Sequence, residues 1–378
     1  MLITRSITNT IVEKLNSSKK GIVIYGARQV GKTTLVNEII KKLNFKTLTI
    51  SGDQSRFLDI LSSRDLNKIK SLVEGYELLF VDEAQRIPEI GLALKIILDN
   101  LPFIKIIVTG SSSLDLASKI SEPLTGRVWT YHLYPISFLE LSKNQNRAEL
   151  DAALEERLIY GSYPELFSIA GSSSKREYLQ NLSDAYLYKD LIEFGEIKNS
   201  SKIRDLLKLL AFQIGSQVSL SEIGSALGIS KDTVARYVDL LEKSFVIFRL
   251  KGLSRNLRKE VVKMDKIYFF DLGIRNILID NLNFLKGRND SGQLWENFLI
   301  TERMKLLASK QDYASIYFWR TYTGAELDYV EEKKGKLTGF EFKFGFKKEK
   351  APAGWAKAYP ESDYQCINRE NYFDFILG

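Results

Sequence analysis

A glycine-rich loop between an apolar run and an amphipathic segment constrains the fold of this chain more than any other feature. The loop, Gly26–Thr33 (GARQVGKT), fits the spacing G-x-x-x-x-G-K-[ST], and the apolar run Gly21–Tyr25 (GIVIY) precedes it directly. Such a run suits a strand that is buried on both faces of a parallel sheet, and Thr33–Leu43 has helical periodicity. The order of strand, loop and helix predicts an α/β domain with a phosphate-binding loop.

The loop carries the groups that a nucleotide triphosphate needs. Its glycines let the backbone pass close to phosphates, and its N–H groups and the following helix N-terminus attract negative charge. Lys32 is expected to reach the β- and γ-phosphates, and Thr33 to bind Mg²⁺ through its hydroxyl. ATP and Mg²⁺ are therefore the expected ligands. The residues expected to contact them are Gly26, Ala27, Arg28, Gln29, Val30, Gly31, Lys32, Thr33 and Thr34.

A second apolar run, Glu77–Val81, is followed by two adjacent carboxylates, Asp82 and Glu83. Asp82 is expected to hold the magnesium ion or its water, and Glu83 to orient and deprotonate the attacking water. A glutamate at this position indicates hydrolysis rather than nucleotide binding alone. The alternative is a strand that ends in a solvated acidic turn.

A third run, Ile104–Val108, leads into Thr109-Gly110-Ser111-Ser112-Ser113. A polar side chain at the tip of the strand beside Asp82 could contact the γ-phosphate or the attacking water, and Ser111 is the candidate. The alternative role is capping of a helix over Leu114–Ile120, which Ser113 could perform. The two roles can be divided among the serines.

Composition excludes several kinds of site. The chain has one cysteine, Cys366, and one histidine, His132, which excludes an internal disulfide, multi-cysteine zinc or iron–sulfur sites, and sites with several imidazoles. A metal here should be a hard cation bound by oxygens. The net charge of +7 favours a polyanionic partner. No segment resembles a signal peptide or spans a membrane, so a cytoplasmic protein is expected.

Several segments together resemble the prokaryotic AAA+ family ATPases that carry a C-terminal domain of unknown function. They are Gly26–Leu35 (GARQVGKTTL), Val81–Pro88 (VDEAQRIP), Thr109–Ser113, Gly126–Phe138 (GRVWTYHLYPISF), Tyr160–Glu165, Tyr186–Leu191 and the C-terminal third. The resemblance implies an ASCE-type P-loop core in which Glu83 is the catalytic carboxylate beside Lys32. It also suggests that Arg127 is an arginine finger or sensor, although an arginine at this position can equally be a structural salt-bridge donor.

Shifts in composition divide the chain into four expected parts. Residues 1–140 are expected to form the AAA+ P-loop ATPase domain, and residues 141–215 a helical lid or linker. Residues 216–275 are expected to form a winged helix-turn-helix, and residues 285–378 a small α/β domain like restriction endonucleases. The oligomeric state stays open, a homo-oligomer included.

Residues 220–238 (LSEIGSALGISKDTVARYV) predict two helices around a tight turn. Apolar positions recur at helical spacing on both sides of Gly228, which suits the left-handed turn between the helices. Ser230 is expected to cap the second helix. Together with strands expected at Phe245–Leu250 and Ile267–Phe270, this pattern predicts a winged helix.

A winged helix can bind duplex DNA with its second helix in the major groove. The wing supports this interpretation, because the span from Arg249 to Lys266 holds seven basic and two acidic residues, a net charge of +5. The alternative is a winged helix used for packing or oligomerisation. The candidate DNA-binding residues are Ser230, Lys231, Thr233 and Arg236 on the helix, and Arg255, Arg258 and Lys259 on the wing.

The C-terminal part carries carboxylates in the order of PD-(D/E)XK nucleases. Glu296 lies on an expected helix, Asp328 on a strand, and Glu341 and Lys343 on the next strand, where alternate residues share a face. Two carboxylates would bind Mg²⁺, and Lys343 would orient the attacking water. The alternative is a cross-strand salt bridge in a fold that no longer cleaves. The helix expected to cover the sheet is also short, with interruptions from Pro352 onward.

Three functions are compatible with these patterns. The first is an ATP-hydrolysing switch that changes how the C-terminal modules engage DNA or a partner. The second is an ATP-regulated, Mg²⁺-dependent DNA nuclease centred on Glu296, Asp328, Glu341 and Lys343. The third is a nucleotide-dependent scaffold or regulator without a catalytic output.

Overall fold

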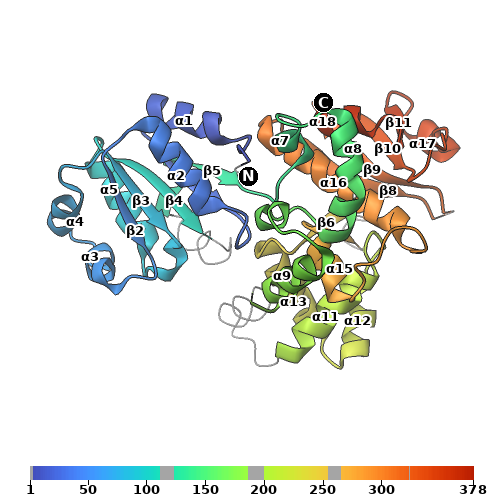
Figure 1. The fold of residues 1–378 in the computed structure, drawn as a ribbon, viewed down its shortest axis with the longest axis horizontal. Coiled ribbons are helices and arrows are strands. Elements are labelled where there is room, and N and C mark those ends of the chain that lie inside the picture. The colour runs from blue at the N-terminus through green and yellow to red at the C-terminus, as the bar shows by residue number, and fades with distance from the viewer. Residues whose placement is uncertain (1–2, 111–122, 186–199, 254–264, 323) are drawn as a thin grey trace. The chain divides into compact units, whose positions relative to one another are not determined.

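The computed structural model describes residues 3–110, 123–185, 200–253, 265–322 and 324–378 (Figure 1). The chain forms two compact units. One consists of Leu2–Pro135 and Lys243–Phe245, and the other of Ile136–Glu242 and Val246–Gly378. No helix within the described ranges is long and apolar enough to cross a membrane.

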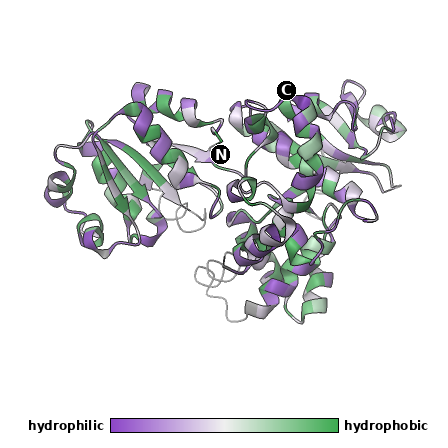
Figure 2. Cartoon of the chain, viewed as in Figure 1, coloured by the Kyte–Doolittle hydropathy of each residue, from purple (hydrophilic) through white to green (hydrophobic). Residues whose placement is uncertain are grey.

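The first unit is built on a parallel sheet of five strands in the order β2-β3-β4-β1-β5, which confirms the expected α/β class. The strands are β1 (Gly21–Tyr25), β2 (Thr47–Ser51), β3 (Leu78–Asp82), β4 (Lys105–Gly110) and β5 (Val128–His132). The inner strands are almost wholly buried, whereas both edge strands are partly exposed. Figure 2 shows that the inner strands are mostly hydrophobic. Because all strands are parallel, their carboxyl ends meet at one edge of the sheet.

Helices cover both faces of this sheet. Along the sheet, the chain steps in one direction from β1 to β2. It steps in the opposite direction from β2 to β3 and from β3 to β4. Since such crossovers are right-handed, α2 lies on one face and α4 and α5 lie on the other. The helices are α1 (Thr8–Ser17), α2 (Lys32–Leu43), α3 (Leu58–Ser62), α4 (Leu66–Val73) and α5 (Ile90–Asn100), with short 3-10 turns η1 (Ser55–Phe57) and η2 (Ala84–Arg86).

The second unit begins with helices, as the composition predicts. They are α7 (Phe138–Leu141), α8 (Arg147–Tyr160), the 3-10 turn η3 (Pro164–Phe167), α9 (Ser172–Ala185), α11 (Ser200–Phe212), α12 (Leu220–Leu227), α13 (Lys231–Lys243) and α15 (Leu272–Leu278). The buried carboxylate of Asp271 caps α15 by accepting from Gly273 N at 2.9 Å. Asp271 also accepts from Ser162 N at 2.7 Å, and so fixes the loop after α8 to the start of α15.

Helices α12 and α13 lie where the sequence places them. Gly228 joins them in the left-handed conformation, with φ 65°. The Ser230 hydroxyl accepts a hydrogen bond from Thr233 N at 3.1 Å, and so caps α13. Strands β6 (Ile247–Gly252) and β7 (Lys266–Phe269) follow as an antiparallel pair.

The β6–β7 pair belongs to a sheet of six strands in the order β11-β10-β9-β8-β6-β7. Its other strands are β8 (Ser315–Arg320), β9 (Glu326–Lys333), β10 (Lys336–Phe342) and β11 (Asp363–Ile367), and its helices are α16 (Ser291–Ser309), α17 (Ala353–Ala358) and α18 (Tyr372–Leu377). Strand β6 pairs in parallel with β8, with Lys251 opposite Tyr317. The parts expected at 216–275 and 285–378 therefore share one sheet within one compact unit.

Candidate functional site

The glycine-rich loop lies between β1 and α2, at the carboxyl edge of the first sheet. Lys32 is buried, and its ammonium donates to the carbonyl oxygens of Gly26 and Ala27, both at 2.9 Å. Gly31 has φ 93°, a conformation that a side chain would strain. The loop backbone therefore folds around the Lys32 ammonium and keeps it at the N-terminus of α2.

Asp82 accepts hydrogen bonds from Thr33 at the start of α2 and from Thr109 on β4. Thr33 Oγ1 donates to Asp82 Oδ2 at 2.9 Å, Thr109 Oγ1 donates to Asp82 Oδ1, and Glu83 N donates to Oδ1 at 3.2 Å. The two predicted magnesium ligands, Thr33 and Asp82, are thus in direct contact although 49 residues separate them. A hydroxyl and a carboxylate at the N-terminus of a P-loop helix form a donor set that fits Mg²⁺.

Glu83 has an unusual backbone for a non-glycine residue, with φ 48° and ψ 45°. Its carboxylate accepts a hydrogen bond from the buried Gln85 side chain. Gly52 packs closely against it, since a Cβ at Gly52 would lie 2.3 Å from Glu83 O. The contacts with Gly52 and Gln85 fix both the backbone and the side chain of Glu83 directly after Asp82.

Two residues of this site were not identified from the sequence. Thr109, at the tip of β4, contacts Asp82, whereas the predicted Ser111 lies outside the described residues. Arg5 is buried, and its guanidinium donates to Val30 O in the loop at 2.8 Å and to Tyr134 O at 2.5 Å. The sequence separation between Arg5 and the loop leaves no local pattern that could reveal this contact.

Arg127 lies at the other edge of the sheet. It directly precedes β5, and its carbonyl accepts a hydrogen bond from Gly21 N at the start of β1, whereas the loop follows the end of β1. Its guanidinium forms a two-point contact with Asp99 at 2.7 and 3.1 Å. The structure therefore shows the salt bridge, and does not place Arg127 beside Lys32 and Glu83 of the same chain.

The second unit brings together the four residues of the nuclease-like motif. Asp328 Oδ2 accepts from Phe342 N at 2.8 Å, and Lys343 contacts Glu341 at 2.8 Å. Glu296 is joined to them by Lys266, which lies 3.2 Å from Glu296 Oε1 and 4.0 Å from Asp328 Oδ1. Glu326 also contacts Lys266, at 2.6 Å, and we call Glu296, Glu326, Asp328 and Glu341 the carboxylate cluster.

Burial and mutual repulsion change the acidity of this cluster. Burial and the nearby Asp328 charge raise the pKa of Glu296 to about 7, and raise that of Glu341 to about 7. Burial alone would lower the pKa of Lys266, but the surrounding carboxylates raise it above its usual value. Lys266 is therefore a charged ammonium, and the raised pKa values of Glu296, Asp328 and Glu341 mean that these three carboxylates hold their protons more tightly than usual.

The predicted DNA-binding residues are only partly placed. Ser230, Lys231 and Arg236 are exposed on or beside α13, and the half-buried Thr233 shares a hydrogen bond with Ser230. Arg255, Arg258 and Lys259 lie outside the described residues.

Two of the basic residues counted for the wing are engaged by carboxylates. Arg249 binds Glu242 and Asp239, and Lys266 is buried in the carboxylate cluster. The charge that the wing offers to a phosphate backbone is correspondingly smaller than the sequence suggests.

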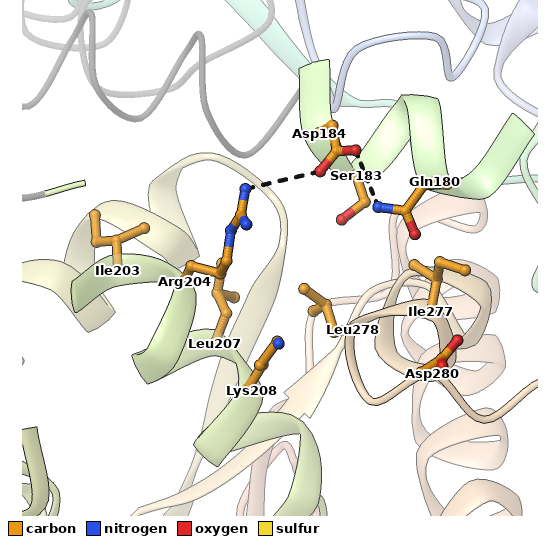
Figure 3. Close-up of a pocket in the computed structure, with 10 residues that line it drawn as sticks. All are labelled: Gln180, Ser183, Asp184, Ile203, Arg204, Leu207, Lys208, Ile277, Leu278 and Asp280. Atoms are coloured by element: carbon orange, nitrogen blue, oxygen red, sulfur yellow. Dashed lines mark hydrogen bonds and ion pairs between the residues drawn. The ribbon is translucent and has the colours of Figure 1, made fainter. Parts of the chain in front are cut away.

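A cavity of about 340 Å³ lies between α9, α11 and α15 (Figure 3). Its lining combines apolar side chains, such as Leu207 and Ile277, with charged ones, and Arg204 points toward Asp184. None of its lining residues belongs to the glycine-rich loop or to the carboxylate cluster.

Comparison with known families assigns the first unit. Residues 18–142 match the sequence model of an AAA domain. Residues 151–284 and 291–372 match two domains of unknown function, DUF8612 and DUF4143. The N-terminal part of the chain is therefore an AAA-type ATPase domain with a P-loop.

Similar chains occur in bacteria and archaea. An uncharacterized protein of Mycobacterium tuberculosis is 29% identical over 328 residues, which cover 85% of this chain and 70% of that protein. An uncharacterized protein of Methanocaldococcus jannaschii is 28% identical over 300 residues, covering 74% and 65%.

Among solved structures, the Walker-type ATPase PABY2304 of Pyrococcus abyssi has a TM-score of 0.48 at 16% identity. The comparison covers 74% of this chain and 96% of that one. The RuvB Holliday junction branch migration motor of Thermotoga maritima has a TM-score of 0.33 at 17% identity, covering 65% and 90%.

Proposed function

We propose that this chain binds ATP with Mg²⁺ at Gly26–Thr33 and hydrolyses the β–γ phosphoanhydride bond. The observation that carries the proposal is the contact between Thr33 and Asp82 at 2.9 Å, with Lys32 inside the loop and Glu83 next in sequence. Lys32 and Thr33 begin α2, and Asp82 and Glu83 follow at the end of β3, so all four lie at the carboxyl edge of the parallel sheet, the place where ligands bind in open α/β sheets.

Each residue has a distinct task in this reaction. Lys32 and the loop N–H groups bind the phosphate oxygens and compensate their charge. Thr33 and Asp82 would hold Mg²⁺, which when bound neutralises charge on the β- and γ-phosphates.

Glu83 is the general base. Its Oε2 is held by Gln85, so we assign Oε1 to the water that attacks the γ-phosphorus. Oε1 accepts the water proton while the bond from the γ-phosphorus to the bridging oxygen breaks, which yields ADP and orthophosphate.

Steady-state release of orthophosphate from ATP tests this proposal. Lys32→Ala removes the charge that binds the phosphates, and we expect loss of both ATP binding and turnover. Glu74→Gln is the matched control, because Glu74 is an exposed carboxylate just ahead of β3, at the sheet edge away from the loop. Unchanged turnover in Lys32→Ala would contradict the assignment of the site.

We further propose that the nucleotide state changes how the second unit engages duplex DNA. The support is the exposure of Lys231 and Arg236 on α13, the second helix of the helix-turn-helix, together with the net charge of the chain. The carboxylates that engage Arg249 and Lys266 reduce the support that the wing gives to this proposal.

Duplex DNA binding should weaken steeply with salt and should differ between ATP and ADP. Joint replacement of Lys231 and Arg236 by alanine should reduce the affinity. Replacement of Lys334, an exposed lysine in the turn between β9 and β10, should leave it unchanged. Equal loss in both variants, or no binding at low salt, would favour a scaffold that contacts proteins only.

A further inference from the structure

Lys266 lies beside three of the four members of the carboxylate cluster. It belongs to β7, is almost wholly buried, and its ammonium lies 2.6 Å from Glu326, 3.2 Å from Glu296 and 4.0 Å from Asp328. These carboxylates come from α16 and β9, which follow β7 by up to 62 residues in the sequence. A single cation therefore faces oxygens from two other elements, as a bound metal ion does.

One oxygen of each of Glu296, Asp328 and Glu341 already accepts a hydrogen bond from a protein donor. Glu296 Oε1 accepts from Lys266 and from the Tyr268 hydroxyl at 2.5 Å. Asp328 Oδ2 accepts from Phe342 N at 2.8 Å, and Glu341 Oε1 accepts from Lys343 at 2.8 Å. A divalent ion requires several oxygen ligands at about 2.0–2.6 Å, and it cannot share that position with an ammonium.

The arrangement of acidic, histidine and cysteine side chains elsewhere in the described residues also offers no metal site. Within the ranges that the structure describes, no group of three or more His, Cys, Asp or Glu side chains is arranged to hold a metal ion. The residues present therefore do not fit the metal centre that a PD-(D/E)XK layout implies.

We infer that Lys266 is a built-in counter-cation that occupies the place of a divalent metal in the carboxylate cluster. In this role it fastens β7, which extends the helix-turn-helix, to α16 and β9 of the C-terminal sheet. The cluster then serves as a structural junction between the two parts of the second unit, and it does not supply Mg²⁺-dependent cleavage of DNA.

Titration of the complete chain with Mn²⁺ in the absence of nucleotide, followed by electron paramagnetic resonance, tests the inference. We expect the wild-type chain to show no Mn²⁺ site that depends on Asp328, so Asp328→Asn should leave its binding curve unchanged. Thr33→Ala removes the hydroxyl expected to bind metal at the glycine-rich loop, so it distinguishes Mn²⁺ bound at the loop from Mn²⁺ bound in the carboxylate cluster.

Removal of the lysine should open the cluster to metal. Lys266→Met is expected to gain one Mn²⁺ per chain with at least tenfold tighter binding than the wild type, and a second change, Asp328→Asn, should abolish that gain. The thermal midpoint of Lys266→Met should be below that of the wild type in EDTA, and it should rise again when Mn²⁺ is added. Lys251→Met is the matched control, because Lys251 is exposed on the neighbouring strand β6.

Two results would overturn the inference. One is a wild-type Mn²⁺ site that Asp328→Asn removes and Thr33→Ala leaves intact. The other is a folded Lys266→Met chain, as judged by circular dichroism, that gains no Mn²⁺. If Lys266→Met does not fold, the wild-type comparison with Asp328→Asn still decides the question.

Discussion

A buried ion pair on α16 should be one of the most sensitive points of the second unit. Glu302 and Lys305 lie one turn apart with a contact of 2.7 Å, and only 2% and 8% of their surfaces are exposed. Glu302 also accepts from Phe138 N at 2.7 Å, and Lys305 donates to Ile136 O at 3.3 Å. The pair thus fastens the first residues of this unit to the helix that carries Glu296.

Glu302→Gln would leave the Lys305 ammonium buried without a counter-charge. Loss of one partner of a buried pair costs about 3–5 kcal/mol of unfolding free energy. For a unit of this size each kcal/mol shifts the melting temperature by about 2–4 °C, so the midpoint should fall by roughly 6–20 °C. The double change to methionine at both positions should recover part of this loss, since neither member of the pair then remains charged, although Phe138 N and Ile136 O lose their partners.

Tryptophan fluorescence during thermal unfolding measures this effect, because Trp295, Trp319 and Trp355 lie in the second unit and only Trp129 lies in the first. Glu361→Gln, at an exposed position of the same unit, is the control. A shift below about 2 °C in Glu302→Gln, or a double variant no more stable than the single one, would refute the reasoning.

Three further predictions concern the pH dependence of stability and the turnover of ATP. Burial raises the pKa of Glu296 from 4.5 to about 7. Between these pH values the folded state therefore binds more protons than the unfolded state. The unfolding free energy of the second unit should fall as pH rises through this window, by about 3 kcal/mol. Chemical unfolding at pH 5 and pH 7.5 should show the fall in the wild type and in Glu361→Gln. The fall should be smaller in Glu296→Gln but still present, because Glu341 has a similarly raised pKa. Arg5→Met should raise the KM for ATP about ten- to a hundredfold, because it removes two hydrogen bonds from a charged donor that holds Val30 and Tyr134, and Arg5→Lys should restore part of the loss. Gly52→Ala should lower kcat with little change in KM, since its Cβ would lie 2.3 Å from Glu83 O and displace the general base; an unchanged kcat would show that Glu83 tolerates the shift.

Local patterns in the sequence were sufficient to predict the P-loop unit. The inner strands are apolar runs, and in a parallel sheet the loop after β1 and the end of β3 lie at the same edge, which brings Thr33 at the start of α2 close to Asp82. The grouping of Asp328, Glu341 and Lys343 likewise follows from the alternation of side chains on adjacent strands.

Other features depend on contacts that no local pattern encodes. Lys266 was counted with the basic wing, but the position of β7 at the sheet edge turns its side chain toward Glu296 and Glu326. For Arg127 the sequence left an arginine finger and a structural salt bridge open, and only the tertiary contact with Asp99, next to the start of β1, reveals the salt bridge. The parallel pairing of β6 with β8 joins segments that the composition separates.

Single-turnover hydrolysis of ATP by Glu83→Gln tests the central claim most directly. Since glutamine cannot accept the water proton, we expect the rate of orthophosphate formation to fall by about 10²–10⁴-fold while the affinity for ATP stays within a few-fold of the wild type. A Glu83→Gln chain that binds ATP and hydrolyses it at the wild-type rate would contradict the assignment of Glu83 as the general base.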